Sequence, residues 1–143
     1  MPTFETVTAS SATLSIGEVA AQTGLSVHAL RFYEREELLI GGVVRTAGGR
    51  RRYTLMDVEW LRICIRLRES GMPLAQLRQF AALVRDGPGN ERQRLALLQE
   101  HENHIRAQLS ALQHCLEIVR YKVGVYQEHI SNDTTRGVWD PTI

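Results

Sequence analysis

The chain has 143 residues, a formal net charge of +1 and 43% hydrophobic residues, which suffice for one globular domain or for a small domain with an extended appendage. No apolar run approaches the roughly 18 to 20 residues of a membrane-spanning helix, and the polar start lacks the segments of a secretory signal. We therefore expect a cytoplasmic protein with no membrane partner, and the two widely separated cysteines fit a reducing compartment.

The charges are distributed unevenly along the chain. Residues 1–85 hold eleven arginines and eight acidic residues, a net charge of +3, whereas residues 86–143 hold six basic and eight acidic residues, a net charge of −2. A surface that binds a polyanion is therefore expected in the first of these two parts.

A short helix is the first expected element, after a flexible polar arm over residues 1–13. Ile16, Val19 and Ala20 recur at spacings of three and four, so they form one apolar stripe on a helix. Gly24 then supplies a turn.

The run SVHALRFYE, residues 26–34, predicts a second helix that Ser26 can cap. Leu30, together with Phe32 or Tyr33, can face the first helix, while His28 and Arg31 point outward. Two short helices joined by a tight turn are typical of a helix-turn-helix, whose second helix enters the major groove of double-stranded DNA.

The segment RTAGGRRRY, residues 45–53, predicts a short hairpin with a tight glycine turn. It places three guanidinium groups beside an aromatic ring, at Arg50, Arg51, Arg52 and Tyr53. Because arginine side chains match phosphate geometry, we interpret this hairpin as a wing that contacts the DNA backbone beside the helix-turn-helix.

Two further helices complete the predicted DNA-binding domain, residues 14–85. Thr54 and Asp57 resemble a capping box that opens a helix ending at Gly71, and Pro73 starts the next helix. The DGPGN segment, residues 86–90, then breaks the helical pattern.

A heptad seam follows within residues 90–128, because apolar positions there alternate steps of three and four. Its apolar or aromatic members are Leu95, Leu98, Ile105, Leu109, Leu112, Leu116, Val119, Val123 and Tyr126, and Glu102 is the charged exception. A helix of about 36 residues spans roughly 54 Å and needs a partner helix. No second long helix is predicted, so we expect a homodimer paired through this seam about a two-fold axis. Glu102 either sets the register or lies where the two helices diverge.

These motifs together resemble the MerR family of transcriptional regulators. The resemblance rests on IGEVAAQTGLSVHALRFYERE, GRRRY, LRESGMPL and the C-terminal coiled coil, in the family's order, over about residues 14–128. LRESGMPL, the GPGN break and LEIVRYKVGVY look most like the short subclass of aldehyde-, thiol- or stress-responsive members. Two departures predict a different helix-to-wing corner. Glu37 stands where the family usually has glycine, and Gly41 and Gly42 stand in a stretch that usually holds proline.

Pattern and resemblance together predict an all-α fold with a small β wing, in which a winged helix-turn-helix domain precedes a long dimerisation helix. The resemblance implies that two such helices form an antiparallel coiled coil. It also implies a dimer that binds an inverted repeat in promoter DNA and distorts the duplex, which affects RNA polymerase indirectly. A small-molecule or electrophile effector would favour one form of this dimer–DNA complex over another. No cofactor is expected, and no nucleophile, phosphate-loop or metal motif suggests an enzyme.

The DNA-contacting residues are assigned by the resemblance, one position at a time. It implies His28 near bases or phosphates, Arg31 on the DNA backbone and Tyr33 as a phosphate or packing contact, with Arg51 and Tyr53 in the wing.

Simpler roles stay open for the same positions. Arg31 could be solvated and paired with Glu34, Ser26 could do no more than cap its helix, and His28 could face solvent. The two tyrosines could serve packing alone.

The candidate thiol sensors are Cys64 and Cys115. Members of the resembling subclass sense electrophiles through a cysteine in the first helix after the wing; Cys64 lies in that helix, although the alignment puts Arg66 at the matching position. The alternative is that both thiols are inert. No metal site is predicted, and His101 and His104 are expected on a solvated surface.

The tail, residues 129–143, is mostly polar with a single Trp139. We expect it to be flexible, the alternative being that Trp139 docks against the partner subunit.

The alternative function is a coiled-coil interaction module without specific DNA binding. Such a module would need the seam but neither the second helix nor the wing, and we therefore favour a regulator.

Overall fold

The computed structural model describes residues 13–42, 44–133 and 139. These residues form five helices and one three-stranded sheet, and the chain divides into two compact units, Met1–His101 and Glu102–Ile143. The predicted arm, residues 1–13, lies outside the described residues except for Thr13, as does most of the predicted tail, residues 129–143. The elements confirm the predicted all-α fold with a small β wing.

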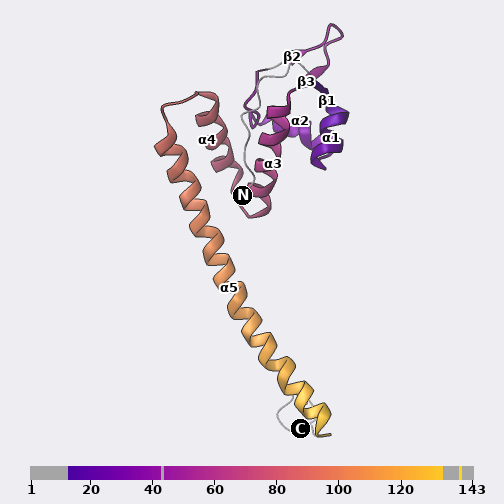
Figure 1. The fold of residues 1–143 in the computed structure, drawn as a ribbon, viewed down its shortest axis with the longest axis vertical. Helices are drawn as coiled ribbons and strands as arrows, with labels where there is room; N and C mark the ends of the chain where they lie inside the picture. The colour runs from indigo at the N-terminus through magenta and orange to yellow at the C-terminus, as the bar shows by residue number, and fades with distance from the viewer. Residues whose placement is uncertain (1–12, 43, 134–138, 140–143) are drawn as a thin grey trace. The chain divides into compact units, whose positions relative to one another are not determined.

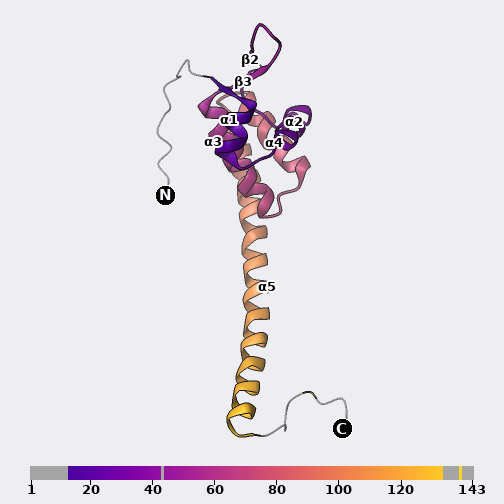
Figure 2. The same cartoon turned by 90° about the vertical axis from the view of Figure 1, so that its right-hand side faces the viewer.

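Helices α1 (Ile16–Thr23) and α2 (Val27–Arg35) form the predicted helix-turn-helix. Gly24 turns the chain between them with a φ of 78°, in the left-handed region that glycine tolerates best. Ser26 caps α2 as predicted, because its hydroxyl oxygen accepts a hydrogen bond of 3.0 Å from the backbone amide of Ala29. The two helices contact each other and lie side by side in Figures 1 and 2.

A small antiparallel sheet supports the wing. Strands β2 (Val44–Arg45) and β3 (Arg51–Tyr53) form the predicted hairpin, and β1 (Leu14–Ser15), which the sequence did not predict, pairs with the other edge of β3. The strand order is therefore β1-β3-β2. The hairpin loop extends beyond the helices of its unit in both views (Figures 1 and 2).

Helices α3 (Leu55–Glu69) and α4 (Leu74–Arg85) complete the first unit. The predicted capping box is present, since Thr54 and Asp57 exchange hydrogen bonds of 2.9 and 3.1 Å between side chain and backbone. Together the helices and β3 enclose a core whose largest fully buried side chains include Leu30, Leu38, Tyr53, Leu61, Met72 and Leu77. Burial of these apolar groups is the main stabilising contribution to the unit.

The corner after α2 has an unusual residue at its centre. The backbone amide of Glu37 donates to the carbonyl of Glu34 at 3.2 Å, and the amide of Leu38 donates to the carbonyl of Tyr33 at 3.0 Å. This pair of bonds is the Schellman arrangement that ends many helices, and it requires a left-handed residue between helix and loop. That residue is Glu37, with a φ of 56°.

Helix α5 (Glu91–Ser131) has 41 residues, about 62 Å of α-helix, and begins in the first unit. Leu97 packs against the core, and His101 is only 3% exposed, with its Nε2 atom 2.8 Å from the hydroxyl oxygen of Ser70. The expectation of a solvated His101 was therefore wrong. The start of α5 belongs to the compact unit that contains the helix-turn-helix.

The seam side chains of α5 are uncovered in the single chain. Leu109 is 55% exposed, Leu112 66% and Val119 56%, values far above those of a buried core. No helix among the described residues is long and apolar enough to cross a membrane.

Candidate nucleic-acid interface

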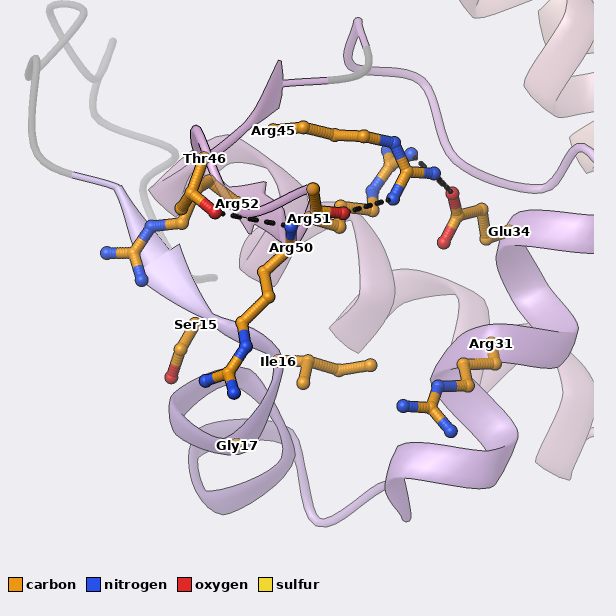
Figure 3. Close-up of a pocket in the computed structure, with 11 residues that line it drawn as sticks. Ser15, Ile16, Gly17, Arg31, Glu34, Arg45, Thr46, Arg50, Arg51 and Arg52 are labelled. Carbon is orange, nitrogen blue, oxygen red and sulfur yellow. Dashed lines mark hydrogen bonds and ion pairs between the residues drawn. The ribbon is translucent and has the colours of Figure 1, made fainter.

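An open groove of about 680 Å³ lies between the start of α1, helix α2 and the wing. Figure 3 shows the side chains that line it. They are Ser15, Ile16 and Gly17 at the start of α1, Arg31 and Glu34 on α2, and Arg45, Thr46, Gly49, Arg50, Arg51 and Arg52 on the wing. Two segments that are separate in the sequence thus place five guanidinium groups around one groove.

The two residues of α2 that were predicted to point outward, His28 and Arg31, are exposed, as is the cap residue Ser26. Of these three, Arg31 lines the groove. Arg31 has no hydrogen bond or ion pair with another described residue, and Figure 3 shows its guanidinium turned away from Glu34. The alternative that Arg31 is occupied by Glu34 is therefore not what the structure shows.

The three consecutive wing arginines occupy three different environments. Arg50 is exposed, and its side chain extends towards the start of α1 in Figure 3. Arg52 is half-buried and donates to Thr13, at 3.0 Å to the hydroxyl and 2.7 Å to the carbonyl oxygen. This hydrogen bonding holds the residue before β1 against β3. Arg50 is therefore the wing arginine best placed for a phosphate.

Arg51 departs from the predicted role of a free phosphate ligand. Its side chain is 6% exposed, and its Nη1 atom lies 3.1 Å from the Oε1 atom of Glu34. The same carboxylate oxygen accepts from Arg45 at 3.0 Å. Arg51 also lies over the Tyr53 ring, 5.2 Å from the ring centroid. In this structure Arg51 connects the wing to α2.

The two candidate tyrosines lie in the core. Tyr53 has no exposed surface and Tyr33 is 8% exposed, with Phe32 packed edge-on against the Tyr33 ring at a centroid distance of 6.3 Å. Burial raises the pKa of both phenols, which keeps them neutral at physiological pH. The structure thus gives both residues a packing role, and their predicted contact with phosphates stays untested.

The two candidate thiols differ in access. Cys64 is fully buried in α3, and this burial raises the pKa of its thiol to about 12. A thiol with that pKa offers almost no reactive thiolate at neutral pH, which argues against Cys64 as an electrophile sensor. Cys115 is exposed on α5. Among the described residues, no group of three histidine, cysteine or acidic side chains is arranged to hold a metal ion.

Glu34 is a site residue that sequence reasoning did not identify. The signal was present, since strand side chains alternate between two faces and Arg51 and Tyr53 must share the face opposite to Arg52. A buried guanidinium then requires a carboxylate, and α2 supplies one at position 34.

Two protein-family models match overlapping parts of the chain. The model for the MerR HTH family regulatory protein matches residues 14–83, and the model described as MerR, DNA binding matches residues 58–118. An uncharacterised HTH-type transcriptional regulator from Haemophilus influenzae is 30% identical over 131 residues, which make up 92% of this chain and 96% of the relative. The chain belongs to the MerR family.

Solved structures of MerR family proteins share the fold. HiNmlR, described as a MerR family regulator lacking the sensor domain and bound to promoter DNA, matches with a TM-score of 0.75 and 29% identity, over 89% of this chain and all of its own. A putative MerR family regulator from Listeria monocytogenes matches with a TM-score of 0.78 and 25% identity, over 84% of this chain and 90% of its own. This MerR family protein is a DNA-binding transcriptional regulator.

Proposed function

We propose that this MerR family protein binds an inverted repeat in promoter DNA as a homodimer and distorts the duplex. Ser26, His28 and Arg31 on α2 would enter the major groove, and Arg50 on the wing would contact the neighbouring phosphates. RNA polymerase would respond to the altered promoter shape without a new contact with the regulator. An effector would shift the balance between forms of the dimer.

One observation carries the proposal: the free guanidinium of Arg31 on α2 and the exposed guanidinium of Arg50 on the wing line the same groove. A reading helix and a phosphate contact must act on the same stretch of duplex, and the position of Arg31 and Arg50 around one groove supports these roles. The alternative, a coiled-coil interaction module, offers no reason for that convergence.

The exposed seam of α5 supports the homodimer. Eight of its apolar or aromatic members are at least 36% exposed in the single chain, from Leu98 at 36% to Leu112 at 66%. An isolated helix gains nothing from such a stripe in water, whereas a second copy would bury it. Two DNA-binding units on one dimer also match the symmetry of an inverted repeat.

Distortion of the DNA is energetically within reach of such a dimer. Bending a short site costs on the order of 1 to 6 kcal/mol, and phosphate contacts from two winged units can offset that cost. An effector that prefers one form needs only a comparable difference in affinity between the two forms.

The experiment that tests the function is a selection of genomic DNA fragments by the purified protein, followed by sequencing. We expect enrichment of an inverted repeat within a promoter spacer. Recovery of fragments with no shared sequence would favour the interaction module.

The groove is tested by Arg31→Ala and Arg50→Ala. Each should weaken binding to all DNA sequences and reduce the slope of log affinity against log salt by about one. The matched control is Arg66→Ala, because Arg66 is an exposed arginine on α3, paired with Glu69 at 2.8 Å, that does not line the groove. If Arg66→Ala has the same effect, the groove is not the DNA site.

The electrophile response would depend on Cys115, because Cys64 is protonated and buried. Transcription from the selected promoter should lose its response to an aldehyde in Cys115→Ser and retain it in Cys64→Ser. An unchanged response in the variant that lacks both thiols would exclude thiol sensing.

A further inference from the structure

The charged residue Glu102 interrupts the apolar seam of α5. The other side chains of α5 indicate which residue of the partner subunit lies beside it. We propose one register for the antiparallel pair of α5 helices that membership of the MerR family implies, in which Glu102 lies beside Arg120 of the partner subunit. This inference rests on the homodimer of the proposed function and specifies how its two helices meet.

The heptad positions of α5 define what can meet across a two-fold axis. The seam occupies the two core positions of the heptad, and each core position is flanked by one further position along the side of the contact. In an antiparallel pair, each flanking position meets the same flanking position of the other helix. One flank of α5 carries Arg92, Gln99, Arg106, Gln113, Arg120 and Gln127. Because like charges directly opposite each other are destabilising, a stable register keeps the arginines of this flank from facing one another across the dimer.

One register buries the whole seam. It pairs Leu95 with the partner's Tyr126 and Ile105 with the partner's Leu116, and it places the two-fold axis between Ser110 and Ala111. Every seam residue from Leu95 to Tyr126 then has a seam residue opposite it. Because a two-fold contact is reciprocal, each such pair occurs twice in the dimer.

In this register the flank arginines are kept apart, and one of them approaches the seam residue Glu102. Val119 of the partner subunit faces Glu102, and Arg120 of the partner subunit lies next to this valine. Arg106, in the same chain as Glu102, approaches it from one turn away, with its Nε atom 3.5 Å from Oε1 of Glu102. The flank itself pairs Arg106 with Gln113 of the partner subunit, so no two arginines meet. Glu102 is 62% exposed in the single chain and can turn towards this contact.

A shift by one heptad in either direction loses this arrangement. Moved one way, the helices bring Arg106 against Arg120 of the partner subunit and leave Leu95 without an apolar mate. Moved the other way, they bring Arg106 against the partner's Arg106, and Glu102 faces the partner's Leu112. Like charges directly opposite are destabilising, and an unpaired carboxylate in an apolar seam is costly. Glu102 and the flank arginines thus favour the proposed register over its two neighbours.

Disulfide trapping tests the register in a Cys115→Ser background. Among the antiparallel registers one heptad apart, only the proposed one places the thiols of the double variant with Ile105→Cys and Leu116→Cys opposite each other. The two positions are about 16 Å apart along one helix, so they cannot form a disulfide within one chain. Mild oxidation should convert this variant to a covalent dimer at least about tenfold more completely than either single variant. Efficient trapping of a single variant would indicate parallel helices.

The matched control is Ile105→Cys combined with Val123→Cys. It has the same number of thiols in the seam, but they meet only if the helices shift by one heptad. Covalent dimer from this variant, with none from the first, would overturn the register. Sedimentation of the wild-type protein separates this outcome from failure of the proposed function, because a monomer at all concentrations would exclude the dimer itself.

Charge exchange tests the ion pair separately. Glu102→Arg and Arg120→Glu should each raise the dimer dissociation constant about tenfold, because two symmetric pairs are lost. The double variant should return to within about threefold of wild type. Glu100→Arg makes the same change of charge outside the seam and should leave the constant unchanged. A double variant as weak as the singles would overturn the pairing of Glu102 with Arg120.

Discussion

Glu37 holds the backbone conformation that glycine adopts at lower cost. The same chain provides the comparison, because α3 ends in the same pair of hydrogen bonds with glycine at the equivalent position. Gly71 donates to Arg68 at 3.0 Å and Met72 donates to Leu67 at 2.9 Å, with a φ of 95° at Gly71. We therefore predict that Glu37→Gly stabilises the first unit.

The magnitude follows from two opposing effects. A side chain with a Cβ atom in the left-handed region costs roughly 1 to 2 kcal/mol, whereas glycine adds about 0.5 to 1 kcal/mol of conformational entropy to the unfolded chain. The Glu37 side chain is exposed and its carboxylate makes no hydrogen bond with another described residue, so little else is lost. We expect the free energy of unfolding to rise by about 1 kcal/mol, and the melting temperature by about 4 to 8 °C for a unit of this size.

Thermal unfolding followed by circular dichroism measures this effect, at one protein concentration because a dimer's stability depends on concentration. Glu37→Ala is the matched control, since it removes the carboxylate and keeps the Cβ atom in the left-handed region. Gly71→Ala is the reciprocal change and should destabilise the unit by about 1 kcal/mol. If Glu37→Gly and Glu37→Ala shift the melting temperature equally, the backbone explanation is wrong.

Two further predictions concern buried groups. The pKa of the Cys64 thiol rises from its ordinary 9.0 to about 12 in the folded chain. Above about pH 9 the unfolded state therefore binds fewer protons, and the free energy of unfolding falls with pH up to about 12. In alkaline denaturation, Cys64→Ala should weaken this pH dependence, and an unchanged profile would count against the assigned burial. Gly41→Ala would place a Cβ atom 2.6 Å from Oδ1 of the buried Asp57, which caps α3, and should lower stability by about 1 to 3 kcal/mol in chemical denaturation, whereas Gly42→Ala, with nothing within 4 Å of the added atom, should not. Equal losses in the two glycine variants would contradict a specific clash.

Helix positions could be predicted from the sequence because local chemistry determines them. Ser26 and the Thr54–Asp57 pair cap helices where a polar side chain meets the start of an apolar stripe. Gly24 and Pro73 lie where helices end or begin. None of these features depends on a distant part of the chain.

The roles of the wing arginines could not be predicted in the same way. Strand alternation places Arg51 and Arg52 on opposite faces of β3, but only the pairing and packing of β3 decide which face is buried. Strand β1 consists of two residues and has no sequence pattern of its own, so the contact of Thr13 with Arg52 was missed. Tertiary pairing determines these environments.

His101 was missed for a related reason. The seam pattern drew attention to one face of α5, whereas Leu97 and His101, four residues apart, lie on another face that packs against the first unit. A helix with two contact faces has two overlapping periodicities, and the stronger one conceals the weaker one.

The ion pair between Arg51 and Glu34 has a consequence for the choice of binding site. Because it joins the wing to α2, the span between the proposed base-reading side chains and the proposed phosphate contact should vary little. A protein surface of fixed span cannot adjust to the duplex, so the duplex must adjust to the protein. Promoters rich in easily deformed base steps should then bind more tightly, even where the sequence differences fall at base pairs that no side chain touches.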